Sequence, residues 1–345
     1  MKSLTAWSIL AGLMGIGSPA AAGPSIREEG FVRIGGIEQW ITIRGADRSN
    51  PVVLFLHGGP GNATSAYADS MFAGWDEDFT LVQWDQRGAG RTYGRTGPSI
   101  EPTLTIDRMT QDGVEVAEYL TTHLGQPRIV LVGGSWGALL GVHIAKQRPD
   151  LFYAYVGTGQ LVTMRENFRA SYQRVLEHAR QSDDSPATDE LTGIGAPPWH
   201  TVAKWRTFRK WRNDYQQALA TTEPLKLVRS PQYETAEDFA NDEGADDLSF
   251  AHFNFVGTSM TGPLMDVDLK KLGAEFEIPV YVIQGAMDLN AVPEVAREYV
   301  EWIKAPAKQF ILVPGSGHTD TRASLDVLLG VLTHQVSDAI ERGRH

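Results

Sequence analysis

Continuous hydrophobic runs alternate with helix-like stretches through the first half of the chain. Runs without polar alternation predict strands that are buried on both faces, as in a parallel sheet covered by helices. They lie at residues 51–56, 79–84, 128–132 and 152–156, and hydrophobic positions at helical spacing lie at 106–124 and 136–147. This alternation predicts right-handed βαβ units and therefore an α/β fold with a mostly parallel sheet. Before it, residues 31–34 and 37–43 predict two strands joined by a Gly35-Gly36 hairpin turn.

The alternation stops after residue 159 and resumes after residue 276. Strands are then predicted at 280–284 and 310–313, and helices at 292–303 and 321–340. A crossover helix needs only a few tens of residues, so the helix-like segment 160–276 is an insertion. We expect it to form a helical cap over the strand ends, where open α/β sheets bind their ligands. The predicted core is then formed by residues 23–159 and 277–345.

The N-terminus has the pattern of a secretory signal peptide. Lys2 precedes a hydrophobic run at 6–15, and the small residues of 18–22 offer a cleavage site. We expect cleavage after Ala22 and export of the mature protein to the periplasm or the medium. The run is too short for a typical membrane span, so no stable membrane insertion is expected after cleavage. An uncleaved N-terminal anchor is the alternative.

Composition narrows the class of partner. The net charge of −11 argues against nucleic acids and anionic membrane surfaces as partners and fits a small-molecule or short-peptide substrate. The absence of cysteine excludes disulfides, thiolate zinc sites and a cysteine nucleophile. No phosphate-binding loop or zinc-protease helix motif occurs, so no metal or cofactor is expected. The oligomeric state is left open.

The most informative motif is Gly133-Gly134-Ser135-Trp136-Gly137, which lies between a predicted buried strand and a predicted helix. Glycine two residues before and two residues after a serine is typical of the nucleophile elbow of α/β hydrolases. A turn this tight leaves no room for a Cβ atom at Gly133 or Gly137, and it projects the Ser135 hydroxyl out of the sheet. The motif alone is also compatible with an ordinary glycine-rich turn.

Two later loops supply the other members of a catalytic triad. A serine hydroxyl needs an imidazole to accept its proton and a carboxylate to fix the imidazole tautomer. In this fold the chain order is serine, acid, histidine. Asp288 follows the predicted strand 280–284, and His318 follows the last predicted strand. Asp320, the nearest rival to Asp288, is interpreted as a helix N-terminal carboxylate.

Residues after the predicted strands 51–56 and 79–84, together with the elbow, are expected to support the triad. Backbone N–H groups of Trp136 and of Gly59 are the expected donors to an oxyanion. His57, which precedes the serine in the chain, is interpreted as a residue that braces its loop by hydrogen bonding. Asp85 and Arg87 are interpreted as a pair that braces the turn after residue 84.

Three motifs together resemble those of the proline iminopeptidase family of α/β hydrolases. They are His57-Gly58-Gly59-Pro60-Gly61, Asp85-Gln86-Arg87-Gly88-Ala89-Gly90-Arg91 and Gly133-Gly134-Ser135-Trp136-Gly137. The resemblance implies a triad of Ser135, Asp288 and His318, a helical cap and acyl-enzyme chemistry. It also implies release of an N-terminal residue, often proline, from peptides.

The resemblance does not identify the residues that bind the substrate. In the family, cap glutamates hold the α-ammonium group, and this cap contains several acids: Glu166, Glu177, Glu190, Glu223, Glu234, Glu237 and Glu243. Glu166 is the expected candidate, whereas the acidic run 234–247 is interpreted as a solvated face. The tryptophans Trp199, Trp205 and Trp211 are interpreted as cap core rather than as the wall of a pocket.

Other functions are compatible with the same catalytic residues. The main alternative is an exported carboxylesterase or amidase for a small hydrophobic ester, lactone or amide. A binding protein on a catalytically inactive hydrolase fold is disfavoured, because both Ser135 and His318 are present. Dehalogenases and many epoxide hydrolases of this fold use an aspartate nucleophile, and the serine at position 135 argues against both.

Overall fold

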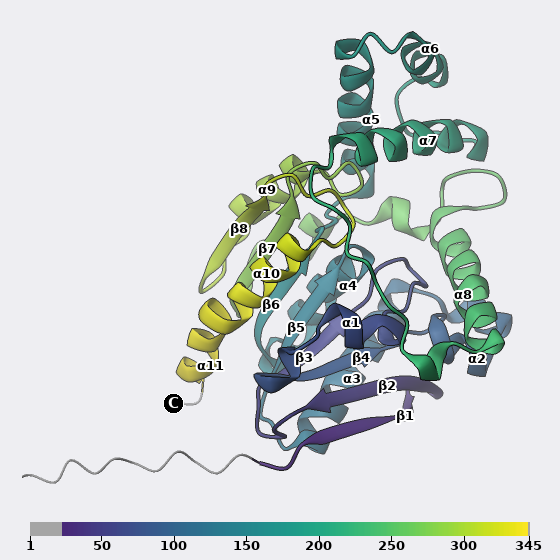
Figure 1. The fold of residues 1–345 in the computed structure, drawn as a ribbon. Helices are drawn as coiled ribbons and strands as arrows, with labels where there is room; N and C mark the ends of the chain where they lie inside the picture. Colours follow the sequence, from purple (N-terminus) through teal and green to yellow (C-terminus); the bar gives the residue numbers. More distant parts are fainter. Residues whose placement is uncertain (1–22, 344–345) are drawn as a thin grey trace, which may run out of the picture.

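The structure, a computed structural model, describes residues 23–343 and contains one eight-stranded sheet (Figure 1). The predicted signal peptide, residues 1–22, lies outside the described residues. The strand order is β1-β2-β4-β3-β5-β6-β7-β8, and the pairs from β4 to β8 are parallel. The strands are β1 Ile26–Ile34, β2 Ile37–Gly45, β3 Val52–Leu56, β4 Thr80–Trp84, β5 Ile129–Gly134, β6 Phe152–Thr158, β7 Val280–Gly285 and β8 Lys308–Val313. The predicted α/β fold with a mostly parallel sheet is confirmed.

The antiparallel edge is the predicted hairpin, with a longer first strand. β1 and β2 pair in register from Ile26 opposite Gly45 to Ile34 opposite Ile37. The turn between them places Gly35 at φ 57° and Gly36 at φ 81°, the left-handed conformation that a two-residue hairpin turn requires. β1 begins earlier than predicted because alternating burial, rather than a hydrophobic run, continues back to Ile26.

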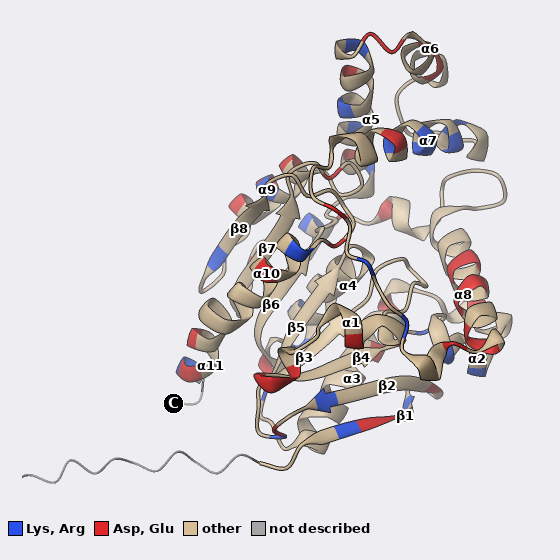
Figure 2. Cartoon of the chain, in the orientation of Figure 1, with Lys and Arg blue, Asp and Glu red and all other residues tan. Residues whose placement is uncertain are grey.

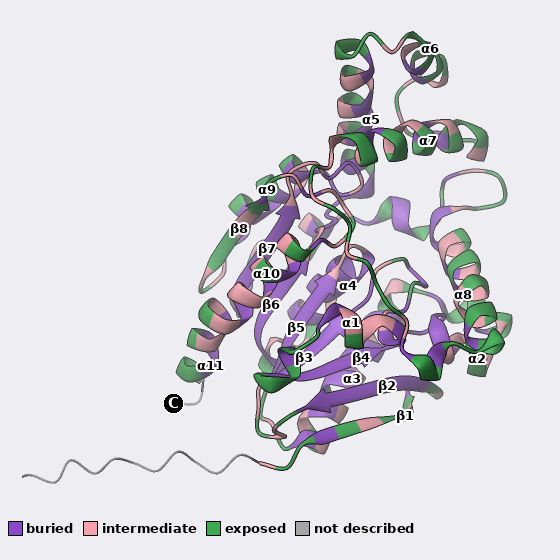
Figure 3. Cartoon of the chain, viewed as in Figure 1, coloured by how far each residue is buried: buried purple, intermediate pink, exposed green. Residues whose placement is uncertain are grey.

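Helices cover both faces of the sheet, and β3 to β7 are almost entirely buried (Figure 3). One face packs against α3, α4 and α9, and the other packs against α1 and the C-terminal helical segment. The core helices are α1 Ala68–Met71, α2 Gly90–Thr96, α3 Ile106–Leu124, α4 Trp136–Gln147, α9 Pro293–Trp302, α10 Arg322–Gly330 and α11 Ser337–Gly343. A π-helical segment, Val331–Val336, joins α10 to α11, so the predicted last helix is continuous but irregular.

The segment between β6 and β7 is helical, as the sequence predicts. Its longer helices are α5 Met164–Gln181, α6 Ser185–Ile194, α7 Val202–Leu219 and α8 Ala236–Asn254. Figure 1 shows α5, α6 and α7 together beyond the carboxyl ends of the strands, and α8 beside α2. Trp199 and Trp205 are buried in the hydrophobic core of this cap, and Trp211 packs against it. Short helical turns complete the chain: η1 Ser65–Tyr67, η2 Trp75–Glu77, η3 Pro98–Thr103, η4 Pro149–Leu151, η5 Pro231–Tyr233, η6 Pro263–Asp266 and η7 Leu269–Leu272.

The acidic helix α8 lies beside α2, and Figure 2 shows acidic residues along it. The interpretation of the run 234–247 as mostly a solvated face holds for most of its acids, whereas Asp238 and Asp242 form ion pairs. Asp238 is buried, and its Oδ1 accepts from Arg91 Nε of α2 at 2.8 Å. Asp242 accepts from Arg229 at 2.5 Å. The remaining acids of the helix are largely exposed. The ion pair of Asp238 with Arg91, which are distant in sequence, therefore fixes α8 to the core, whereas the pair of Asp242 with Arg229 lies within the cap segment.

Within residues 23–343, no helix is both long enough and hydrophobic enough to cross a membrane.

Candidate active site

The predicted elbow joins β5 to α4. Ser135 has φ 54° and ψ −113°, a strained conformation for a non-glycine residue. A Cβ at Gly133 would lie 2.3 Å from the carbonyl oxygen of Gly137, and a Cβ at Gly137 would lie 2.1 Å from that of Leu56. Both contacts are with backbone and cannot be relieved by a rotamer change. The two glycines are therefore required for the turn that presents Ser135.

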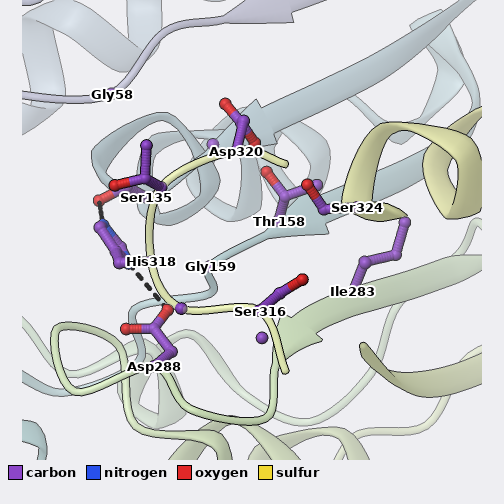
Figure 4. Close-up of a pocket in the computed structure, with 14 residues that line it drawn as sticks. Gly58, Ser135, Thr158, Gly159, Ile283, Asp288, Ser316, His318, Asp320 and Ser324 are labelled. Atoms are coloured by element: carbon purple, nitrogen blue, oxygen red, sulfur yellow. Dashed lines mark hydrogen bonds and ion pairs between the residues drawn. The ribbon is translucent and has the colours of Figure 1, made fainter. Parts of the chain in front are cut away.

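Ser135, His318 and Asp288 form one hydrogen-bonded chain at the carboxyl ends of β5, β8 and β7 (Figure 4). His318 Nε2 lies 3.0 Å from Ser135 Oγ, and His318 Nδ1 lies 2.8 Å from Asp288 Oδ2. Both distances are within hydrogen-bond range. The three residues predicted from the sequence are thus brought together, in the order that proton transfer through a serine, histidine and carboxylate would require.

The carboxylate of Asp288 is buried and held from several sides. Its Oδ1 accepts from the backbone N–H groups of Asn290 at 2.7 Å and Ala291 at 2.8 Å, and its Oδ2 also accepts from Gln284 Nε2 at 3.0 Å. Gln284 in turn donates to the carbonyl of Ala291. These donors fix the plane of the carboxylate. Sequence analysis missed Gln284, since a glutamine at a strand end carries no motif.

Burial alone would lower the pKa of His318, but the adjacent Asp288 carboxylate more than offsets it and raises that pKa above its ordinary value. A carboxylate next to an imidazole favours the imidazolium form. Arg212, a cation of the cap helix α7, acts in the opposite direction on the same ring. His318 is therefore a stronger base than a free histidine, and the cap contributes to its tuning.

Helix α7 contacts the loop that carries the acid. Gln216 donates from Nε2 to the carbonyl of Met287 at 2.7 Å, and its Oε1 accepts from the N–H of Leu289 at 2.7 Å. Arg212 lies four residues earlier, on the same face of the helix. Burial lowers the pKa of Arg212 to about 10. Within residues 23–343 its guanidinium has no carboxylate at ion-pair distance and donates to Asn213 Oδ1.

The predicted oxyanion donors lie at the entrance of α4 and in the loop after β3. Trp136 is the first residue of α4, where backbone N–H groups have no partner within the helix. Its indole Nε1 donates to Gln86 Oε1 at 3.0 Å, and Gln86 Nε2 donates to the carbonyl of His57 at 3.1 Å. Gln86 thus links the elbow to the loop of His57. Gly58 lines the pocket at Ser135. The N–H of Gly59 belongs to the peptide bond between Gly58 and Gly59.

His57 has the bracing role predicted for it. Its Nε2 accepts from the backbone N–H of Gln86 at 3.2 Å, and burial lowers its pKa to about 4. The neutral His57 imidazole accepts this hydrogen bond and so holds the loop after β3 against the loop after β4.

Asp85 and Arg87 make structural contacts around the turn after β4, as predicted, but each does so through other residues and not through the other. Arg87 instead forms a two-bond ion pair with Asp112 of α3, with Nε at 2.7 Å and Nη2 at 3.2 Å from the carboxylate oxygens. Asp85 accepts from the N–H of Arg91 at 2.9 Å at the start of α2. Its burial raises its pKa to about 7. Arg87 also donates to the carbonyl of Gly35, so its side chain connects the turn after β4 to the β1–β2 hairpin and to α3.

Residues from several strand ends line a pocket beside Ser135. Its volume is about 120 Å³, and its lining is Gly58, Gly134, Ser135, Thr158, Gly159, Ile283, Gly285, Asp288, Ser316, Gly317, His318, Thr319, Asp320 and Ser324. Glu166 is not in this lining; it lies on a separate surface with Lys270 at 3.9 Å, so its predicted approach to the site is wrong. In the described part of the chain, no group of three or more acidic or histidine side chains is arranged to hold a metal ion.

Comparison with known proteins identifies the family. A family model described as "alpha/beta hydrolase fold" matches residues 51–320. The chain belongs to the α/β-hydrolase family.

Similar proteins include several peptidases. The chain is 28% identical over 294 residues to a probable aminopeptidase, YbaC, of Bacillus subtilis, covering 83% of this chain and 89% of the relative. It is 26% identical over 290 residues to a probable proline iminopeptidase of Leptolyngbya boryana, covering 79% and 83%. The crystal structure of proline iminopeptidase from Mycobacterium smegmatis superposes with a TM-score of 0.64 at 21% identity, covering 90% of this chain and 98% of that one. This structural likeness concerns the fold, and the resemblance drawn from the three motifs is confirmed.

Proposed function

We propose that this α/β hydrolase is a serine aminopeptidase that releases an N-terminal residue of the proline type from short peptides. The observation that carries the proposal is the hydrogen-bonded chain from Ser135 through His318 to Asp288. Sequence similarity over most of the chain to proteins named probable aminopeptidase and probable proline iminopeptidase supports the substrate class.

The proposed acyl transfer gives each of these residues one role, which the hydrogen-bonded chain supports. Ser135 Oγ attacks the carbonyl carbon of the scissile bond while His318 Nε2 accepts its proton. Asp288 holds His318 in the tautomer with the proton on Nδ1 and stabilises the imidazolium that forms. His318 then donates the proton to the leaving amine, and an acyl-enzyme remains on Ser135. In the second half-reaction a water molecule loses a proton to His318 and attacks the acyl carbonyl, which releases the free N-terminal residue.

Backbone donors would stabilise the negative charge of the tetrahedral intermediate. We assign these donors to the N–H groups of Trp136, which follows Ser135 in the chain, and of Gly59, which follows the pocket residue Gly58. The bracing by Gln86, which binds both the Trp136 indole and the His57 carbonyl, supports this assignment because it fixes the two donor loops relative to each other.

A carboxylesterase or amidase for small esters, lactones or amides is the second candidate. The observation that favours it is that no glutamate of the cap lines the pocket at Ser135, among the residues that the structure describes. An ester substrate without an ammonium group would need no such partner. The catalytic residues and the chemistry would be the same.

Substrate profiling separates the two candidates. We expect the purified protein to hydrolyse prolyl and other aminoacyl anilides with a free α-amino group, and to hydrolyse N-acetylated forms of the same anilides far more slowly. Release of the anilide chromophore measures both. Turnover of short-chain p-nitrophenyl esters without turnover of any free aminoacyl anilide would reject the aminopeptidase and favour the esterase.

The pH profile tests the role of His318. Since its pKa is raised by Asp288, kcat/KM should fall on acidification with an apparent pKa above about 6.5, the ordinary value for histidine. Arg212→Gln removes a nearby positive charge, so this acid limb should move further towards high pH. Arg206→Gln, at an exposed position of the same helix, serves as the matched control and should leave the limb in place. A limb unaffected by Arg212→Gln would show that the cap does not tune His318.

A further inference from the structure

The pocket at Ser135 contains a carboxylate that the triad does not use. Asp320 lies two residues after His318, in the loop between β8 and α10. It lines the same pocket as Ser135, together with the hydroxyl-bearing residues Thr158 and Ser324 (Figure 4). Asp288 and Asp320 are the acids of this lining, and Asp288 is committed to His318.

Among the described residues, the side chain of Asp320 has no hydrogen-bond or ion-pair partner. Its backbone oxygen accepts from the N–H of Leu225, but neither carboxylate oxygen has a hydrogen bond or an ion pair within residues 23–343. Asp288, by comparison, accepts from four donors. Burial raises the pKa of Asp320. The nearby His318 acts in the opposite direction and favours the charged form of Asp320, but it donates no hydrogen bond to this carboxylate. A half-buried carboxylate without a hydrogen-bond donor would be stabilised by a cation that enters the pocket.

Helix capping does not account for this carboxylate. The N-cap of α10 is Thr321, whose Oγ1 accepts from the N–H of Ser324 at 3.1 Å. Ser324 Oγ in turn accepts from the N–H of Thr321 at 2.8 Å, which completes a capping box. The donors at this helix start are thus satisfied by hydroxyl groups. The interpretation of Asp320 as a helix N-terminal carboxylate does not explain where its side chain lies.

The surroundings of Asp320 fit a small hydrophobic residue. A second pocket shares Gly58, Gly134, Thr158 and Asp320 with the first, so the carboxylate stands where the two adjoin. The rest of its lining is mostly apolar: Phe55, Leu56, Met71, Phe72, Val132, Leu325 and Leu328. Both spaces are small compared with the roughly 300–1,000 Å³ of pockets for drug-sized ligands. They suit one residue of a substrate rather than a long chain.

The chemistry of the substrate limits where its ammonium partner can lie. In an α-aminoacyl substrate a single carbon separates the ammonium nitrogen from the carbonyl carbon that Ser135 attacks. The partner must therefore line the pocket of the nucleophile. Glu166 lies elsewhere, and the cap acids Asp238 and Asp242 are paired with arginines of the chain.

We propose that Asp320 binds the α-ammonium group of the substrate and so selects peptides with a free N-terminus. This inference rests on the aminopeptidase function proposed above. The ammonium group would complete the unpaired carboxylate of Asp320, and a small apolar side chain such as that of proline would lie in the adjoining apolar pocket. Asp320 is then a specificity residue, whereas the triad performs the bond cleavage.

Asp320→Asn tests this role by comparing two substrates. Because a hydrogen bond to a charged group is lost, kcat/KM for a prolyl or alanyl anilide should fall by roughly 10- to 150-fold relative to kcat/KM for a p-nitrophenyl ester without an amino group. Most of the loss should be a rise in KM. Asp320→Glu keeps the charge and should recover part of the selectivity. Asp326→Asn, at an exposed position of α10, is the matched control and should not change the ratio.

The outcomes are distinct. An equal loss on anilide and ester in a folded Asp320→Asn protein would mean that Asp320 acts on the triad, and it would overturn the proposed role. Unchanged hydrolysis of the anilide would overturn it as well, while leaving the aminopeptidase function intact. If the unmodified protein hydrolyses only the ester, the aminopeptidase function fails and the role of Asp320 with it.

Discussion

Asp288→Asn should lower kcat by about 10,000-fold without unfolding the protein. An asparagine presents either an amide N–H₂ or a neutral oxygen to His318 Nδ1, so it no longer holds the imidazole in the tautomer that leaves Nε2 free to accept the proton from Ser135. The measurement is the single-turnover or steady-state rate on the preferred substrate, with the folded state checked by circular dichroism.

Asp266→Asn provides the control for this substitution. Asp266 forms an exposed ion pair with Arg165 in the cap, so its replacement should leave kcat within about twofold, as expected for surface pairs of small energy. A comparable loss in both variants would indicate a general defect of the preparations. Retention of more than a tenth of kcat in Asp288→Asn would contradict the assignment of Asp288 as the orienting carboxylate.

Asp112→Asn should destabilise the fold by about 3–5 kcal/mol, the typical cost of leaving one member of a buried ion pair uncompensated. The side chains of Arg87 and Asp112 are 2% and 0% exposed. Arg87 also binds the carbonyl of Gly35 and the hydroxyl of Thr103, so the charge cannot move to solvent without breaking these contacts. Urea unfolding monitored by tryptophan fluorescence gives the change in free energy of unfolding.

A surface pair offers the matched comparison. Asp150 pairs with Arg148 at 2.7 Å, and the side chains of Arg148 and Asp150 are 35% and 61% exposed. Asp150→Asn removes a charge in the same way and should cost no more than about 1 kcal/mol. If the two substitutions lowered the free energy of unfolding by similar amounts, the buried pair of Arg87 and Asp112 would contribute no more to stability than a surface pair. That result would contradict the prediction.

The triad can be predicted from the sequence because each of its residues lies in a short loop directly after a recognisable strand. The glycines around Ser135 report a turn that admits no Cβ, and the places of Asp288 and His318 follow from the strand order. The hydrophobic runs likewise predict the sheet, because each buried strand must be apolar on both faces. The long helical segment between β6 and β7 is evident from the interruption of that alternation.

Contacts between distant segments could not be predicted in the same way. Arg87 stands two residues from Asp85 in the chain, yet its partner lies on α3, and only the packing of α3 against the hairpin brings Asp112 to it. Most acids of α8 are exposed, but Asp238 forms an ion pair with Arg91 of α2, which no local pattern predicts. Gln216 and Gln284 hold the acid loop without belonging to any motif.

The lining of the pocket at Ser135 differs from what the composition of the cap suggests. The glutamates of the cap suggest an abundant choice for the ammonium group, yet the described structure places none of them in the lining at Ser135. Asp320, which does line it, follows the last strand and was assigned to a helix terminus from its position in the chain. Its true surroundings depend on the capping of α10 by Thr321, which leaves the carboxylate unused.

Covalent labelling tests most directly whether Ser135 is the nucleophile of an acyl-transfer enzyme. The protein is incubated with a fluorophosphonate, and its intact mass and peptide map are measured beside those of Ser135→Ala. We predict a single adduct per chain, located on Ser135 and absent from the variant. A wild-type protein that takes up no label, or one that is labelled elsewhere and equally in Ser135→Ala, would contradict the account.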